Sequence, residues 1–133
     1  MWRHKQNERK APLQVLAVTT FAGDVLALGA MAAAEGWQLE TCASVSEAVV
    51  LLARIPGRVV LLDRDVSALG WRGALTALLA SRESRVVLIS PVTDDFLWDE
   101  VVRLGGYDVI TRPLDAARTL SAVNLAVTAM RAG

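Results

Sequence analysis

The sequence predicts an α/β fold, a doubly wound five-stranded parallel sheet in a three-layer (βα)5 sandwich. Two observations carry this prediction. Short apolar runs rich in β-branched residues recur along the chain, and a segment long enough for a helix follows each of them. Strict alternation of strand and helix implies right-handed crossovers between parallel strands. With 133 residues, 53% of them hydrophobic, the chain has the size and apolar content of one folded domain.

Five segments have the composition of strands. Four of them are nearly continuous in apolar residues, as expected for strands that are covered on both faces. The other, residues 37–42, alternates apolar and polar residues and suits an edge strand. The four apolar strands are predicted at residues 13–18, 58–62, 85–89 and 107–110.

Five helices are predicted between and after these strands, at residues 24–35, 46–54, 71–81, 94–104 and 115–131. Small polar residues that favour N-caps stand at four of their starts, and glycine or proline follows three of their ends. The expected caps are Asp24, Ser46, Asp94 and Asp115, and the expected stops are Gly36, Pro56-Gly57 and Gly105-Gly106.

Charge divides the chain into a basic tail, residues 1–11, and a folded domain, residues 12–133. The whole chain balances 14 basic against 14 acidic residues, and both of its lysines, Lys5 and Lys10, lie in the tail. Without a surplus of cations over the domain, direct nucleic-acid binding is not expected. No signal peptide or membrane-length apolar run is apparent, so a cytoplasmic protein without a membrane partner is expected.

Polar residues end several of the predicted strands. In a doubly wound sheet, chemistry gathers at the carboxyl ends of the strands. The candidate pocket residues are therefore Thr19, Thr20, Asp63, Ser90, Arg112 and Pro113.

From residue 12 to about residue 131, this pattern resembles the receiver domain of bacterial two-component response regulators, the CheY-like fold. Asp63 in VVLLDRD matches the family's phospho-accepting aspartate. Ser90 in VVLIS matches its Ser or Thr, and Arg112-Pro113 in GGYDVITRP matches its Lys-Pro. The separations of 27 and 22 residues fit the family's spacing. The resemblance implies phosphorelay signalling with Asp63 as the candidate phospho-acceptor.

Three departures from the family pattern bear on that function. Thr19-Thr20 replaces the acidic pair that holds Mg²⁺ in the family, Arg112 replaces the lysine, and Val109 replaces the aromatic switch residue. Threonine hydroxyls lack the negative charge that Mg²⁺ prefers, so Mg²⁺ binding is expected to be weak or absent, with no other cofactor. Asp24 is expected to cap its helix and point away from the pocket. We expect Asp63 and Arg112 to form a buried ion pair.

The sequence thus predicts an atypical, non-enzymatic receiver that acts through protein–protein contact. Expected partners are a histidine kinase or another signalling protein, or a second copy in a homodimer. Two docking faces are predicted: helices 24–35 and 115–131, or helix 94–104 with strand 107–110 and helix 115–131. The interface candidates are Met31, Phe96, Trp98 and Val123.

Two alternatives stay open. One is a conventional receiver that a histidine kinase phosphorylates at Asp63. The other is a flavodoxin-like flavin-binding domain, in which the hydroxyl-bearing segment Thr19–Gly23 would hold the flavin phosphate.

Overall fold

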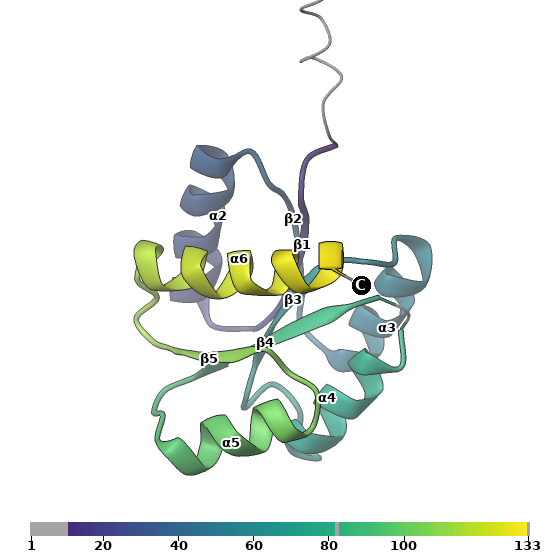
Figure 1. The fold of residues 1–133 in the computed structure, drawn as a ribbon, viewed down its shortest axis with the longest axis vertical. Coiled ribbons are helices and arrows are strands. Elements are labelled where there is room, and N and C mark those ends of the chain that lie inside the picture. Colours follow the sequence, from purple (N-terminus) through teal and green to yellow (C-terminus); the bar gives the residue numbers. More distant parts are fainter. Residues whose placement is uncertain (1–10, 82, 133) are drawn as a thin grey trace, which may run out of the picture.

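Strand β3 (Val59–Asp63) forms the centre of a five-stranded parallel sheet in the order β2-β1-β3-β4-β5 (Figure 1). This computed structural model describes residues 11–81 and 83–132. The predicted fold class is confirmed, and each element lies within two residues of its predicted bounds. The other elements are β1 (Gln14–Val18), α2 (Ala22–Glu35), β2 (Gln38–Cys42), α3 (Val45–Arg54), α4 (Trp71–Leu79), β4 (Arg85–Ser90), α5 (Asp95–Arg103), β5 (Asp108–Thr111) and α6 (Ala116–Ala132).

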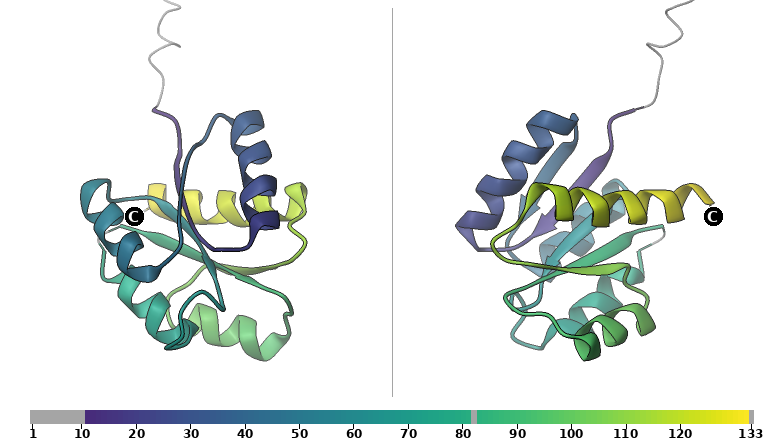
Figure 2. Two further views of the ribbon diagram at one scale, coloured as in Figure 1. Left: turned by 180° about the vertical axis from the view of Figure 1, so that it is seen from behind. Right: turned by 60° about the vertical axis from the view of Figure 1, so that its left-hand side comes forward.

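Helices α2 and α6 cover one face of the sheet, and α3, α4 and α5 cover the other (Figures 1 and 2). Because successive strand residues point to opposite faces, each apolar strand serves two cores. Val59 and Leu61 of β3 pack beneath α2 and α6. Val60 and Leu62 pack beneath α3, α4 and α5. The continuous apolar runs of the sequence are explained by this double coverage.

The strand register aligns the candidate residues at one edge of the sheet. Val18 at the end of β1 pairs with Leu62, and Asp63 pairs with Ile89 of β4. Ser90 in turn pairs with Thr111, the last residue of β5. The carboxyl ends of β1, β3, β4 and β5 therefore meet, and they bring together residues that are far apart in sequence.

The helix starts confirm two of the predicted caps. Asp94 accepts a hydrogen bond from the Leu97 N–H at 2.8 Å, and Asp115 accepts one from the Arg118 N–H at 2.9 Å. The prediction for Ser46 was wrong, because Ser44 caps α3 by accepting from the Glu47 N–H at 3.1 Å. Ser44 and Glu47 form the Ser-x-x-Glu pattern of a capping box, which starts the helix one residue earlier.

The prediction that Asp24 caps its helix was also wrong. Helix α2 begins at Ala22 with Phe21 at the N-cap, so Asp24 is the third residue of the helix and is buried. At that position its side chain points toward the sheet. Asp24 consequently belongs to the candidate site described below.

Two of the predicted interface residues lie in the core. Met31 of α2 and Val123 of α6 are buried against β1, β3, β4 and β5 and cannot contact a partner. Leu26 of α2 and Leu125 of α6 are exposed instead. Both helices carry apolar or small residues around most of their circumference, so their inward faces could not be identified from the pattern.

Residues 1–10 lie outside the described residues, and with them nearly all of the predicted basic tail. Among the described helices, none combines the length and the apolar character that crossing a bilayer requires.

Candidate functional site

Asp63 forms one side of the candidate site. It is the last residue of β3, and its side chain is largely buried at the carboxyl edge of the sheet. One carboxylate oxygen, Oδ1, accepts the N–H of Asp65 at 2.9 Å. The other, Oδ2, lies 3.0 Å from Nη2 of Arg112. The ion pair that the sequence predicts between Asp63 and Arg112 is present.

Asp24 forms the opposite side of the site, and the sequence reading missed it. The Nε of Arg112 donates to both oxygens of Asp24 at 3.0 Å, and Nη2 donates to Oδ2 at 2.7 Å. The side chain of Asp24 is 1% exposed and that of Arg112 is 13% exposed. Arg112 therefore bridges two buried carboxylates with one guanidinium group. We call Asp24, Asp63 and Arg112 the ionic triad.

The guanidinium group is strongly held in this position. Hydrogen bonds to Asp24, together with the interaction with Asp63, raise the pKa of Arg112 above its ordinary value against the opposing effect of burial. An arginine so placed stays charged, and its planar fork suits carboxylate recognition. The triad is thus a buried network with two negative groups and one positive group.

Thr19 connects the end of β1 to the triad, whereas Thr20 does not. The Thr19 hydroxyl donates to Asp24 Oδ2 at 3.0 Å and accepts the Phe21 N–H at 3.1 Å. Thr20 is exposed. Thr19 therefore supports the loop before α2, and its hydroxyl also orients the carboxylate of Asp24.

Phe21 covers one side of the triad. The centre of its ring lies 4.7 Å from Cζ of Arg112, within the range of a cation–π contact. Gly23 leaves space for this ring, because a Cβ atom there would approach Phe21 Cε2 to 2.8 Å. The small residue therefore allows the aromatic ring to lie over the guanidinium group.

Ser90, Pro113 and Val109 take no part in the hydrogen bonds of the triad. The Ser90 hydroxyl is buried and hydrogen-bonds with the backbone carbonyl and N–H of Val92. Pro113 is exposed and follows a cis peptide bond. Val109 is buried in the core beneath α5. The structure thus joins Asp63, Arg112 and Thr19 with Asp24 and leaves Thr20, Ser90 and Pro113 outside this network.

The triad fits a magnesium ion poorly. Mg²⁺ requires anionic oxygen ligands in octahedral geometry. Here the oxygens of Asp24 and Asp63 that face each other are both within 3.0 Å of the same guanidinium nitrogen. Among residues 11–81 and 83–132, no group of three or more His, Cys, Asp or Glu residues is placed to hold a metal ion.

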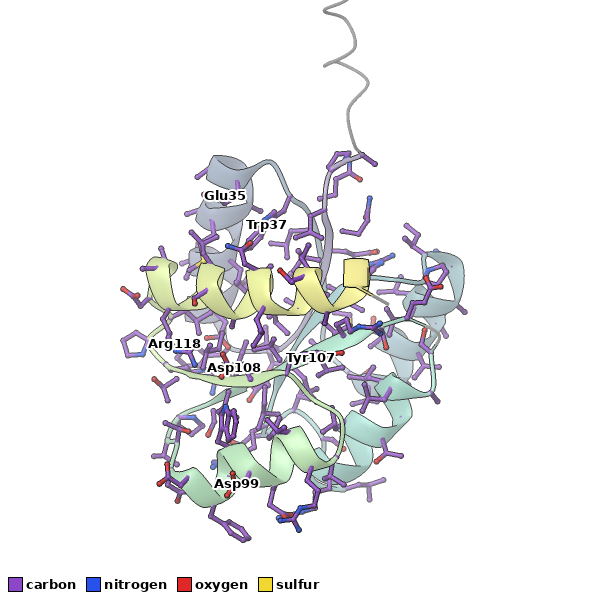
Figure 3. The ribbon with its side chains drawn as sticks, viewed as in Figure 1. Glu35, Trp37, Asp99, Tyr107, Asp108 and Arg118 are labelled. Carbon is purple, nitrogen blue, oxygen red and sulfur yellow. The ribbon has the colours of Figure 1, made fainter. Side chains whose placement is uncertain are left out.

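A second feature is the surface of α5, β5 and α6. Phe96 is 67% exposed and Trp98 is 44% exposed on α5. Beside Trp98, Arg118 of α6 donates two hydrogen bonds of 2.9 Å to Asp108 of β5, and Figure 3 shows the side chains of Arg118 and Asp108 next to each other. Although burial acts to raise it, the hydrogen bonds from Arg118 and the Val109 N–H hold the pKa of Asp108 below its ordinary value. We call this surface the α5–β5–α6 face.

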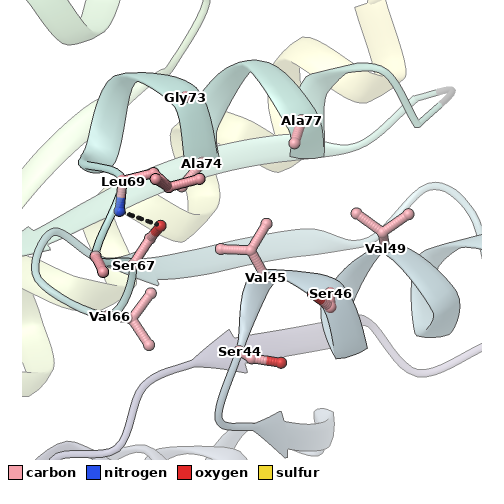
Figure 4. Close-up of a pocket in the computed structure, with 11 residues that line it drawn as sticks. Ser44, Val45, Ser46, Val49, Val66, Ser67, Leu69, Gly73, Ala74 and Ala77 are labelled. Carbon is pink, nitrogen blue, oxygen red and sulfur yellow. Dashed lines mark hydrogen bonds between the residues drawn. The ribbon is translucent and has the colours of Figure 1, made fainter.

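A third feature is an apolar groove of about 620 Å³ between α3 and α4 (Figure 4). Val45 and Val49 of α3 face Gly73 and Ala77 of α4 across it. Its lining is made of aliphatic and small residues with three serines, and it has no charged side chain. The groove is therefore unsuited to acid–base or metal chemistry.

Comparisons with solved structures agree with this fold. The signal receiver domain of a putative Luxo repressor protein from Vibrio parahaemolyticus superposes with a TM-score of 0.80 at 15% identity, covering 91% of this chain and 94% of that one. The chemotaxis protein CheY4 from Vibrio cholerae gives 0.74 at 18% identity, covering 85% and 99%. A chain of the CheX–CheY–BeF3–Mg²⁺ complex from Borrelia burgdorferi gives 0.75 at 27% identity, covering 84% and 87%.

The chain therefore has the CheY-like receiver fold. In sequence, no family model and no curated protein matches it.

Proposed function

We propose that this protein is an atypical receiver module of two-component signalling, which acts through protein–protein contact with little or no Mg²⁺-dependent phosphorylation of Asp63. One observation carries the proposal: Arg112 bridges Asp63 and Asp24 in the ionic triad. The receiver fold supports the signalling role, since its structural neighbours include response-regulator receiver domains.

The triad acts against phosphoryl transfer in two ways. Arg112 engages the Oδ2 oxygen of Asp63, and Oδ1 accepts a backbone N–H, so both oxygens of the would-be nucleophile already have partners. A divalent ion is the usual stabiliser of charge on a transferring phosphoryl group, and the site fits such an ion poorly. Asp63 is then a structural anion, held by Arg112 in one state.

Signalling in this proposal depends on surface contacts. The α5–β5–α6 face offers exposed aromatic residues, Phe96 and Trp98, of the kind that anchor interfaces. The Borrelia burgdorferi neighbour comes from a complex of CheX with CheY, which supports a role for such a fold in binding a signalling protein. A histidine kinase or another signalling protein is the expected partner.

Phosphorylation of the purified chain tests the proposal against the conventional-receiver alternative. The protein is incubated with acetyl phosphate and Mg²⁺, beside a receiver that has an intact acidic pair, and the intact mass of each protein is measured. We expect the reference receiver to gain the adduct and this chain to remain unmodified. A stoichiometric gain that Asp63→Asn abolishes would overturn the proposal in favour of a working phospho-acceptor.

The flavin-binding alternative has less support. The Thr19 hydroxyl, which would have to donate to a flavin phosphate, donates to Asp24 instead. The carboxylate of Asp24, which accepts this hydrogen bond, would repel a phosphate group. A colourless purified protein is the expected result, and a yellow one would contradict it.

A further inference from the structure

We infer that the guanidinium group of Arg112 is a tethered cation that takes the place of a divalent metal ion, so that a neutral residue at position 112 turns Asp24 and Asp63 into a divalent-cation site. The inference rests on the proposed function, because it explains how the receiver fold keeps its acidic edge without metal. It adds a specific consequence: one substitution creates a metal requirement.

Charge is the first argument. The side chains of Asp24 and Asp63 are 1% and 7% exposed, and a buried carboxylate needs a cation or several hydrogen-bond donors. Within the part of the chain that the structure describes, Arg112 is the cation that forms an ion pair with either of them. Without it, two negative groups would face each other at the edge of the sheet.

Ligand chemistry is the second argument. Asp24 and Asp63 contact the guanidinium nitrogens of Arg112 directly. Thr19 adds a third oxygen-bearing side chain, because its hydroxyl donates to Asp24 Oδ2. Carboxylate and hydroxyl oxygens suit hard divalent cations, which complete their shell with water. Once the side chain of Arg112 is shortened, its volume becomes space for an ion and its waters.

The covering ring is the third argument. Phe21 lies over the guanidinium group at 4.7 Å from ring centre to Cζ, and it does so because Gly23 leaves room for it. An aromatic face attracts a cation, so this contact holds the arginine between the two carboxylates. The arginine is thereby retained on two sides by anions and on a third by the ring.

Metal binding by purified variants tests the inference, with Mg²⁺ and Mn²⁺ alone as the probes. Arg112→Ala opens the space. Arg112→Gln removes the charge but keeps amide donors for Asp24, so it serves as the variant that folds if Arg112→Ala does not. Arg64→Gln is the matched control, because Arg64 pairs with the exposed Asp65 outside the triad. Calorimetry gives the dissociation constant, and thermal melting with and without metal gives the linked stabilisation.

We expect the neutral variants at position 112 to bind metal at least about tenfold more tightly than the wild type. Their melting temperatures should rise with metal, whereas the wild type and Arg64→Gln should not respond. Adding Asp24→Asn to Arg112→Gln should remove the gain. A folded Arg112→Gln protein that binds metal no better than the wild type overturns the inference.

The two proposals fail in different ways. If Arg112→Gln gains no metal affinity while the wild type stays unphosphorylated, the tethered-cation inference fails and the proposed function stands. If the wild type gains a phosphoryl group at Asp63, the proposed function fails. If the wild type also binds Mg²⁺ as tightly as Arg112→Gln, both fail.

Discussion

Asp24 and Arg112 are 88 positions apart in the chain, yet three hydrogen bonds of 2.7–3.0 Å join their side chains. This contact ties the first turn of α2 to the loop that follows β5. Because Arg112 also pairs with Asp63 at the end of β3, one guanidinium group holds three elements at the carboxyl edge of the sheet. The stability of that edge should therefore depend strongly on Arg112.

Arg112→Ala should lower the free energy of unfolding by about 3–5 kcal/mol, because it leaves two buried carboxylates without their cation. Urea-induced unfolding without divalent metal measures the loss. Arg72→Ala is the control, since the pair between Arg72 and Glu100 lies at the surface and should contribute less than about 1 kcal/mol. Equal losses in the two variants would contradict a buried, coupled network.

The two carboxylates should differ in their contributions. Asp24→Asn removes the negative charge and one of the two oxygens that accept three guanidinium hydrogen bonds, whereas Asp63→Asn removes one ionic contact and leaves the Asp24–Arg112 pair intact. We expect Asp63→Asn to cost about 1 kcal/mol and Asp24→Asn clearly more. Urea unfolding of both variants under the same conditions gives the order, and a larger loss for Asp63→Asn would refute it.

Phe21 and Gly23 give a test of the cover over the triad. Phe21→Ala should cost about 0.5–1 kcal/mol through the lost cation–π contact. Gly23→Ala should displace the same ring and lose the same contact. Its higher helix propensity, a gain of about 0.8–1 kcal/mol, should offset the cost of losing that contact. In both variants the NMR signal of the Arg112 Nε–H should lose the shift caused by the ring. An unchanged signal in Gly23→Ala would mean that the ring has not moved.

Arg118→Ala should raise the pKa of Asp108. The variant lacks the Arg118 hydrogen bonds that lower this pKa, while burial continues to raise it. A carboxyl group whose pKa is lowered by folding stabilises the protein at pH values above its pKa in the unfolded chain, near 3.8. That stability is lost as the pH falls through the folded value. Between pH 5 and pH 3, the free energy of unfolding of the variant should therefore fall less than that of the wild type. Unfolding curves at each pH measure this free energy, and an NMR titration of the carboxyl groups measures the pKa of Asp108. Parallel curves for the two proteins would argue against the pair.

Contact through the α5–β5–α6 face predicts a contrast between two exposed apolar residues. We expect weak self-association in sedimentation, which Phe96→Glu abolishes and Leu26→Glu leaves intact. Both residues are at the surface, so each change should alter the free energy of unfolding by less than about 0.5 kcal/mol. Loss of association only in Leu26→Glu would assign the contact to α2 instead.

The arrangement of strands was predictable from local patterns. Strands β1, β3 and β4 are apolar between their polar end residues, because both of their faces are covered. The alternating 37–42 segment lies at the edge of the sheet as predicted. Asp63 ends one predicted strand and Arg112 follows another. Because the carboxyl ends of parallel strands lie at the same edge of a sheet, contact between these two residues could be predicted from the strand positions.

Helix phase was harder to read. In α2 the buried Met31 and the exposed Leu26 look alike in a sequence of alanine, leucine and glycine, so no polar stripe marks the outer face. The same ambiguity in α6 concealed the burial of Val123. Asp24 was misread for a related reason, because an aspartate near a helix start satisfies the capping pattern whether it caps or not.

By itself, the chain's pattern of apolar runs and stop signals determined the order of the elements and which residues end the strands, since those properties depend on neighbours in sequence. The direction in which each side chain of a uniformly apolar helix points depends on packing against residues far away along the chain. Only the tertiary structure could therefore decide that Asp24 turns inward and that Arg112 stands between two carboxylates.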